Sequence, residues 1–345
     1  MASREIVFIT GGSGHIGYRV IVEALEAGYN VRAAVRSQAK AEKILSAPSI
    51  KALNPGDRLT FVEVPDLTED GAYDSAIQGA KYAIHVASPI TSSFPEDGDL
   101  KEYFVEPAVK GTMSLLRAAH KAGSVEGVVI TSSVVGIIPF RELTSGKSEA
   151  VFDENSRIAT PLKYESIFEA YSASKAAALN EAEEWVNKTH PSFSVVHIFP
   201  SFVIGKDELV TNIKDVFYGT NKEVLIPVTG GDDGVKPGAS VHLVDVAKAH
   251  VRALDPAIAI NSKGLILSAG GLHGTRWEDS ITIVAENFKD AVKSGTLINN
   301  GTIATNPIKI DERQSEKVLG FRFRSFEEQV TSVVSHYLEL AENSQ

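Results

Sequence analysis

The 345-residue sequence predicts an α/β protein with a doubly wound parallel sheet and a smaller C-terminal lobe. Over the first 130 or so residues, short β-branched runs alternate with helical patterns, which is typical of right-handed strand–helix–strand units. These runs are largely apolar on both faces, as expected for parallel strands that helices cover on each side. Beyond residue 200 the alternation becomes irregular, which indicates a change of architecture.

Five strands and four helices are expected in the first part of the chain. The strands are predicted at Ile6–Thr10, Val31–Val35, Leu59–Val64, Tyr82–Val86 and Val128–Thr131. The helices are predicted at Ile16–Ala27, Gln38–Ser46, Asp70–Ile77 and Leu100–Ala122. An Ala-rich helical run, Ala173–Val186, follows later, and a strand at Ser194–Phe199 is expected to join the same sheet.

The later part of the chain is expected to form the smaller lobe. Its predicted elements are strands at Val224–Val228 and Gly264–Ser268 and helices at Leu243–Leu254, Trp277–Val292 and Phe326–Ala341. We therefore assign residues 1–200 to the sheet domain, with contributions from residues 240–255, and residues 201–345 to the lobe. Because ligands of open α/β sheets bind at the carboxyl ends of the strands, we expect the lobe to pack there and bind substrate.

Composition excludes several classes of function. The chain has 34 Lys plus Arg against 44 Asp plus Glu, a net charge of −10, which disfavours binding to nucleic acid. It contains no cysteine, which excludes disulfides, thiolate nucleophiles and zinc sites built on sulfur. Neither a signal peptide, a lipidation signal nor a membrane-spanning run of about 18 apolar residues is present, so we expect a cytoplasmic protein without membrane contact.

A glycine-rich segment lies directly between the first strand and the first helix. Gly11 permits a tight turn, Gly14 lets the backbone approach a pyrophosphate, and Gly17 allows the helix to pack against the strand. Exposed N–H groups at the helix start would hold the anion. The segment predicts a Rossmann-type dinucleotide site, with cofactor-binding candidates Thr10, Gly11, Ser13, Gly14, His15, Ile16 and Gly17.

The residues after the second strand favour NADP over NAD. An NAD-selective fold usually places an acid near this strand end, and positions 33–36 hold none. Arg36 and Lys40, four apart on an incipient helix, can clasp a 2′-phosphate instead. Asp66 and Leu67, after the third strand, are candidates for contact with the adenine.

A tyrosine and a lysine four residues apart are the catalytic candidates. Tyr171 and Lys175 face the same way on a helix, and a nearby ammonium favours the phenolate. Ser133 follows the fifth strand, at the carboxyl edge of the sheet, where it could hydrogen-bond a substrate carbonyl while Tyr171 protonates it.

Taken together, these motifs resemble those of an extended short-chain dehydrogenase/reductase, in the subgroup of plant dihydroflavonol reductases and fungal aldehyde, methylglyoxal and ketone reductases. The matching stretches occur in family order from residue 6 to about 255. They are Thr10–Gly17, Val35–Gln38 with Lys40, Val64–Leu67, Val86–Pro89, Pro107–Thr112, Thr131–Ser133, Tyr171–Lys175, Pro200–Gly205 and Val241–Ala247.

The resemblance implies a role for each site residue. Tyr171 would be the general acid, Ser133 would polarise the carbonyl, and Lys175 would bind the nicotinamide ribose and lower the pKa of the tyrosine. In the family the second of the two serines is catalytic, which selects Ser133 over Ser132. Pro200 and Val203 would lie against the nicotinamide of NADP(H), and Ala87 and Ser88 would line the path of the cofactor. Such a protein would act on a small-molecule carbonyl substrate as a monomer or homodimer.

Two positions depart from the family pattern. Many members carry an asparagine where this chain has Ala108, which puts an asparagine-supported proton relay in doubt, although Pro-Ala is frequent in this subgroup. The Gly-Pro frequent after the sixth strand is Gly205-Lys206 here, which leaves the shape of that loop open.

The leading hypothesis is an NADPH-dependent reductase of aldehydes or ketones. A nucleotide-sugar epimerase/dehydratase or a hydroxysteroid dehydrogenase would share the same Ser, Tyr and Lys residues. A redox sensor that binds NADP without turnover is the alternative from a different class. The nine histidines show neither HxxxH nor HExxH spacing, so no metal site is predicted.

Overall fold

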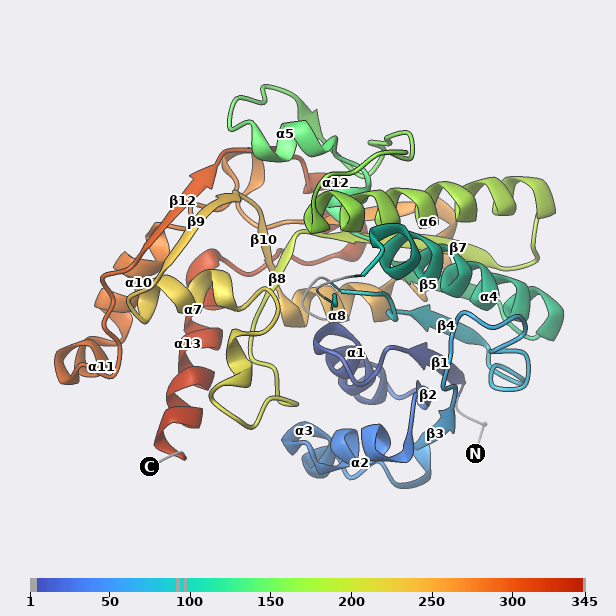
Figure 1. The fold of residues 1–345 in the computed structure, drawn as a ribbon. Coiled ribbons are helices and arrows are strands. Elements are labelled where there is room, and N and C mark those ends of the chain that lie inside the picture. Colours follow the sequence, from blue (N-terminus) through green and yellow to red (C-terminus); the bar gives the residue numbers. More distant parts are fainter. Residues whose placement is uncertain (1–4, 91–93, 96–97, 344–345) are drawn as a thin grey trace. The chain divides into compact units, whose positions relative to one another are not determined.

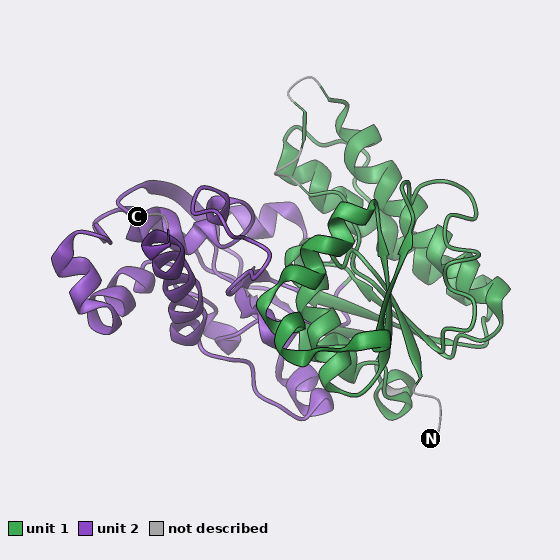
Figure 2. Ribbon diagram, turned by 90° about the horizontal axis from the view of Figure 1, so that it is seen from below, with its two compact units in different colours: residues 1–137, 157–199, 247–265 green, residues 138–156, 200–246, 266–345 purple. Residues whose placement is uncertain are grey.

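The computed structural model describes residues 5–90, 94–95 and 98–343. The first four and the last two residues, on which part of the argument about targeting signals rests, lie outside the described residues. The chain divides into two compact units (Figure 2). Unit 1 comprises residues 1–137, 157–199 and 247–265, and unit 2 comprises residues 138–156, 200–246 and 266–345.

The main sheet has seven strands in the order β11-β7-β5-β4-β1-β2-β3 (Figure 1). Their bounds are β1 Ile6–Thr10, β2 Asn30–Val35, β3 Leu59–Glu63, β4 Tyr82–His85, β5 Gly127–Thr131, β7 Ser194–Pro200 and β11 Gly264–Leu267. The neighbouring pairs from β3 to β7 are all parallel. The strand order reverses between β1 and β4, which is where ligands bind in sheets of this kind. The predicted doubly wound α/β fold is confirmed.

The helices of unit 1 include α1 His15–Glu26, α2 Gln38–Ser46, α3 Pro48–Leu53, α4 Glu106–Ala122, α6 Ile167–Thr189 and α9 Pro256–Asn261. Helix α8, Leu243–Arg252, contributes its later residues to this unit. Helices α4 and α6 pack against each other, and Leu116 of α4 and Ala182 of α6 belong to the same buried cluster as Phe8 and Val128 of the sheet. This packing fixes α6 and its polar residues relative to the sheet.

One predicted helix in unit 1 is wrong, and one is interrupted. Residues 70–79 form consecutive turns instead of a helix over Asp70–Ile77. Gly71 and Gly79 take φ of +76° and +72°, a backbone conformation that cannot belong to a right-handed helix. The helix expected over Leu100–Ala122 starts as a π-helical turn at Lys101–Val105 and becomes α-helical only from Glu106, next to Pro107, which cannot donate a backbone hydrogen bond.

Unit 2 contains three small two-stranded parallel sheets. They pair β8 Phe202–Ile204 with β10 Ser240–His242, β9 Asp232–Pro237 with β12 Thr302–Asn306, and β6 Val151–Phe152 with β13 Lys309–Ile310. The helices are α5 Phe140–Thr144, α7 Lys222–Val228, α10 Asp279–Asn287, α11 Lys289–Ser294, α12 Arg313–Leu319 and α13 Phe326–Glu342. Their core is built around Trp277, which is 0% exposed and donates its indole N–H to the Pro237 carbonyl at 2.9 Å.

Two predicted elements of this unit are wrong, and the strand predicted for the lobe at Gly264–Ser268 lies instead in the main sheet, as β11. The predicted strand Val224–Val228 is part of helix α7. A short apolar run fits a strand or a buried helix equally well, and tertiary packing selects the helix here. The helix expected over Trp277–Val292 is two helices, broken at Phe288, whose φ of −125° and ψ of 42° are not helical. None of the helices in the described part of the chain has the length and apolar character needed to span a bilayer.

Candidate active site

The glycine turn after β1 is too tightly packed to accept side chains at two positions. Gly11 has φ of +73°, and a Cβ there would lie 2.6 Å from the Ala87 nitrogen. A Cβ on Gly17 would lie 2.1 Å from the Gly11 oxygen. We expected this glycine to let the helix pack against the strand, but it packs against the turn itself. Gly14 is the exposed N-cap of α1, whose first turn carries no acidic residue. The turn and helix start thus form a cradle that fits a pyrophosphate.

A buried hydroxyl connects this turn to the neighbouring strand β4. Thr10 Oγ1 lies 2.8 Å from His85 Nδ1, and it accepts hydrogen bonds from the backbone N–H groups of Val86 and Ala87, both at 3.3 Å. Burial, with Lys175 nearby, lowers the pKa of His85 to about 3, so this imidazole is neutral at physiological pH. The ends of β1 and β4 are therefore held together on either side of the point where the strand order reverses.

The residues predicted to choose the cofactor lie near one another at the end of β2. Arg36 is exposed and precedes α2, whereas Lys40 is exposed in the first turn of that helix. Asp66 accepts hydrogen bonds from the Thr68 backbone N–H and hydroxyl, which lower its pKa, and the Arg36 guanidinium lowers it further. Leu67 is half-buried, and its Cδ1 would lie 2.3 Å from a Cβ at Gly111, so this side chain packs toward α4.

Helix α6 presents the predicted tyrosine and lysine one turn apart. The Lys175 ammonium lies 5.4 Å from the centroid of the Tyr171 ring and donates to Ser88 Oγ at 3.0 Å. The Phe104 ring meets the Tyr171 ring edge-on, with centroids 6.5 Å apart. Lys175 is only 6% exposed, whereas Tyr171 is partly exposed. The side chain of Ser88 thus links the segment after β4 to the predicted catalytic helix.

The segment after β5 is fixed against the same helix. Ser133, 9% exposed, caps a short 3₁₀ turn by accepting from the Val135 N–H at 3.4 Å. The Ser172 hydroxyl donates to the Val135 carbonyl at 2.6 Å, and a Cβ at Gly136 would lie 3.0 Å from Lys175 Cβ. The structure therefore brings the segment that carries Ser133 to the turn of α6 that carries the tyrosine and the lysine.

Burial shifts the pKa values of both α6 residues away from their ordinary values. It raises the pKa of Tyr171 to about 12 and lowers the pKa of Lys175 to about 8. The shift of Tyr171 comes from loss of hydration, so the expectation that the lysine and a bound nicotinamide lower the pKa of the tyrosine stays a prediction. At neutral pH the phenol is protonated and able to donate, and the lysine is mostly charged.

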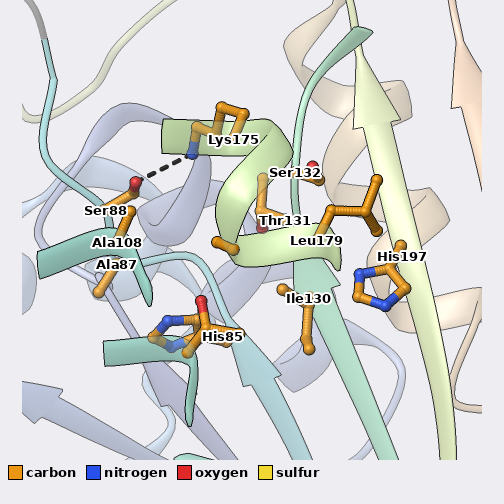
Figure 3. Close-up of a pocket in the computed structure, with 12 residues that line it drawn as sticks. His85, Ala87, Ser88, Ala108, Ile130, Thr131, Ser132, Lys175, Leu179 and His197 are labelled. Carbon is orange, nitrogen blue, oxygen red and sulfur yellow. Dashed lines mark hydrogen bonds between the residues drawn. The ribbon is translucent and has the colours of Figure 1, made fainter. Parts of the chain in front are cut away.

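A small cavity with both polar and apolar lining lies alongside Lys175 (Figure 3). Its lining includes Ala108, the position where many family members carry asparagine, and the hydroxyl-bearing Thr112. Ser132 Oγ and His197 Nδ1 also line it, and neither has a hydrogen-bond partner among the described residues. Sequence reasoning set Ser132 aside and missed His197, which pairs with Ile130 across β5 and β7. Alternation along a strand indicates the face of a side chain but not its partner on the next strand.

The last two predicted cofactor residues lie in unit 2. Pro200 is the last residue of β7, and Val203, 6% exposed, is the middle residue of β8. The other predicted site residues lie in unit 1.

The chain is similar to known proteins over nearly its whole length. A model of the NAD-dependent epimerase/dehydratase family matches residues 7–264. The chain belongs to this family. A ketoreductase of Cercospora nicotianae is 39% identical over 350 residues, which cover 99% of this chain and 97% of that protein. A ketoreductase of Aspergillus fumigatus is 33% identical, with 98% of this chain and 99% of that protein covered. The crystal structure of the yeast methylglyoxal/isovaleraldehyde reductase complexed with NADPH superposes with a TM-score of 0.79 at 27% identity, covering 98% of this chain and 99% of that chain.

Proposed function

We propose that this family member is an NADPH-dependent reductase that converts an aldehyde or ketone to the alcohol. The observation that carries the proposal is the placement of Tyr171 and Lys175 on one turn of α6, with Lys175 hydrogen-bonded to Ser88 at the end of the strand beside the glycine turn. Relatives named as ketoreductases and a structural neighbour complexed with NADPH support it.

The residues present fit the cofactor along its length. The glycine turn would hold the pyrophosphate at the start of α1, since Gly11 and Gly17 let the turn fold tightly against Ala87 and against the helix. Arg36 and Lys40 would hold the 2′-phosphate, and Asp66 and Leu67 would contact the adenine. Within unit 1, the contacts near the nicotinamide would come from Ala87, Ser88 and Lys175. When bound, NADPH supplies the hydride from nicotinamide C4.

The side chains of α6 and β5 would supply the rest of the chemistry. The Ser133 hydroxyl would donate a hydrogen bond to the carbonyl oxygen and increase the electrophilicity of its carbon. Tyr171 would donate its proton to that oxygen as the alcohol forms. The raised pKa of Tyr171 keeps the phenol protonated before the reaction, and the charged Lys175 beside it stabilises the phenolate that the transfer leaves.

Oxidation of NADPH in the presence of a panel of aldehydes and ketones tests the proposal. The Tyr171→Phe variant should lose at least about a hundredfold in kcat, because it lacks the acid, while it binds NADPH normally. Tyr29→Phe is the matched control, since Tyr29 lies in the turn between α1 and β2. Absence of turnover with every carbonyl, or a Tyr171→Phe variant as active as the control, would refute the proposal. Turnover also excludes a redox sensor, and competition by a nucleotide sugar would favour an epimerase/dehydratase instead.

A further inference from the structure

The cavity beside Lys175 is formed entirely by unit 1. Its lining comes from β4 and the two residues that follow Val86, from α4, from β5 and Ser132 after it, from α6 and from β7. It measures about 10 Å³, which is close to the smallest volume that holds one water molecule. Ala108 of α4 contributes only a methyl group to the wall, so the cavity is not filled from that side.

Two buried polar atoms of this cavity have no hydrogen-bond partner in the part of the chain that the structure describes. They are Ser132 Oγ and His197 Nδ1, on residues that are 7% and 3% exposed. Figure 3 shows both side chains and Lys175 around the cavity. A polar atom that loses its hydration without a replacement bond destabilises the fold, and buried waters ordinarily bond such atoms.

The Lys175 ammonium supplies a third polar group to the same cavity. It has three N–H donors, and among the described residues its hydrogen bond goes to Ser88 Oγ, at 3.0 Å. The neighbouring Thr131 hydroxyl is already bonded to His250 Nε2 at 2.7 Å. A water molecule can accept from the ammonium and can also bond Ser132 and His197, whichever nitrogen of the imidazole carries the proton.

We propose that this cavity binds one water molecule, which Ser132 and His197 hold against the Lys175 ammonium. The two side chains are then positioning residues, because they act on the reaction through the lysine. The inference rests on the proposed function, in which the charged lysine stabilises the phenolate of Tyr171. Since a hydrogen bond from the ammonium to water favours the charged lysine, loss of the water should lower the pH above which activity is lost.

The titratable groups around the cavity leave Lys175 as the one that changes charge near pH 8. Burial lowers the pKa of His85 on β4 to about 3 and that of His197 on β7 to about 4, so both imidazoles are neutral. Tyr171, on the same helix as the lysine, has a pKa raised to about 12. The residues that line the cavity from α4 and from β5 with Ser132 carry no titratable group; they are Ala108, Thr112, Ile130, Thr131 and Ser132.

Three substitutions remove the water in different ways. Ser132→Ala and His197→Phe each remove one of its partners, whereas Ala108→Val fills its space with two further methyl groups. Ser280→Ala and His336→Phe are the matched controls, because each also removes a buried and unpartnered atom of the same kind, but in unit 2. For each protein, kcat for carbonyl reduction is measured from pH 6 to pH 10 with saturating NADPH, and the midpoint of urea unfolding records any loss of stability.

We expect kcat of the wild type to fall above about pH 8, as Lys175 loses its proton. In the three cavity variants the fall should begin about one pH unit lower, because the charged amine has lost a hydrogen bond, and kcat at pH 6 should change by less than about threefold. The two controls should follow the wild-type profile. Cavity variants whose profiles match those of the controls would overturn the inference.

A crystal structure of the NADPH complex provides the direct test. We expect a water within hydrogen-bond distance of Ser132 Oγ, His197 Nδ1 and Lys175 Nζ in the wild type, and no water there in Ala108→Val. A dry cavity in the wild type would overturn the inference. Absence of turnover with every carbonyl would instead refute the proposed function, so the two failures are distinguished.

Discussion

Replacing Lys175 by methionine should stabilise the protein while it abolishes reduction. Lys175 is 6% exposed, and its pKa is lowered from 10.5 to about 8 by burial. At pH 7 it is charged in both the folded and the unfolded chain, so folding must remove an ammonium from water. The lowered pKa corresponds to a cost of about 3 kcal/mol. Methionine fills similar space without a charge.

The gain should depend on pH with a definite sign. Between pH 8 and 10.5 the unfolded chain binds the lysine proton and the folded chain does not, so the stability of the wild type rises with pH over this range. At about pH 9.5 the cost of burial falls to about 1.5 kcal/mol. Loss of the hydrogen bond to Ser88 offsets about 1 kcal/mol of the gain at both pH values, because a neutral amine can make this bond as well. We therefore expect Lys175→Met to be more stable by about 2 kcal/mol at pH 7, and the advantage to shrink by more than half at about pH 9.5.

Urea unfolding of both proteins at the two pH values measures this difference. Lys188→Met is the matched control, because Lys188 lies on the same helix and is exposed. The control should change stability by less than about 0.5 kcal/mol at either pH and should keep its activity. If Lys175→Met is less stable than the wild type, or if its gain in stability is the same at both pH values, burial of the Lys175 ammonium does not destabilise the fold and the reasoning is refuted.

Two further predictions concern the cofactor and the stability of unit 2. Arg36→Asp should change the ratio of kcat/KM for NADPH to kcat/KM for NADH by about a hundredfold in favour of NADH, because it replaces a cation proposed to bind the 2′-phosphate. Lys43→Asp, one turn beyond Lys40 on α2, should leave this ratio unchanged. Steady-state kinetics with both cofactors measure the ratio. In unit 2, burial and the neighbouring Asp233 raise the pKa of Glu223 to about 8, so the folded chain keeps a proton that the unfolded chain loses. The stability of the wild type relative to that of Glu223→Gln should therefore fall as pH rises from 5 to 8, as urea unfolding of both proteins at several pH values would show.

The sequence was most informative where local chemistry determines structure. Strand β1 and helix α2 have the predicted bounds. The apolar run of β1 ends at a glycine turn, and α2 follows directly after Ser37, whose side chain makes no capping bond. The prediction failed at Asp70–Ile77, where helical apolar spacing is overridden by glycines at positive φ, and at Val224–Val228, where tertiary packing selected a helix. Short apolar runs do not carry enough information to choose between the two elements.

In the candidate site, too, local sequence predicted some features and tertiary packing determined the others. Spacing alone placed Tyr171 and Lys175 on one helical turn, and the end of a parallel strand placed Ser133 near the sheet edge. The direction in which the pKa of Tyr171 shifts could not be derived from the four-residue spacing of Tyr171 and Lys175. That spacing indicates that the ammonium is near the phenol, but it says nothing of how much water the phenol loses on folding. That loss comes from residues distant in sequence, such as Phe104 from the π-helical turn before α4.

The raised pKa of Tyr171 describes the state from which the proposed proton donor starts. A phenol with a pKa of about 12 is protonated at neutral pH, as a proton donor must be. The Lys175 ammonium, 5.4 Å from the centroid of the Tyr171 ring, would act on the phenolate that donation leaves, because the attraction between opposite charges arises only then. The same two groups would serve the reverse proton transfer during alcohol oxidation. The side chains of α6 would therefore affect the rate in both directions, and the supply of cofactor and substrate would set the direction.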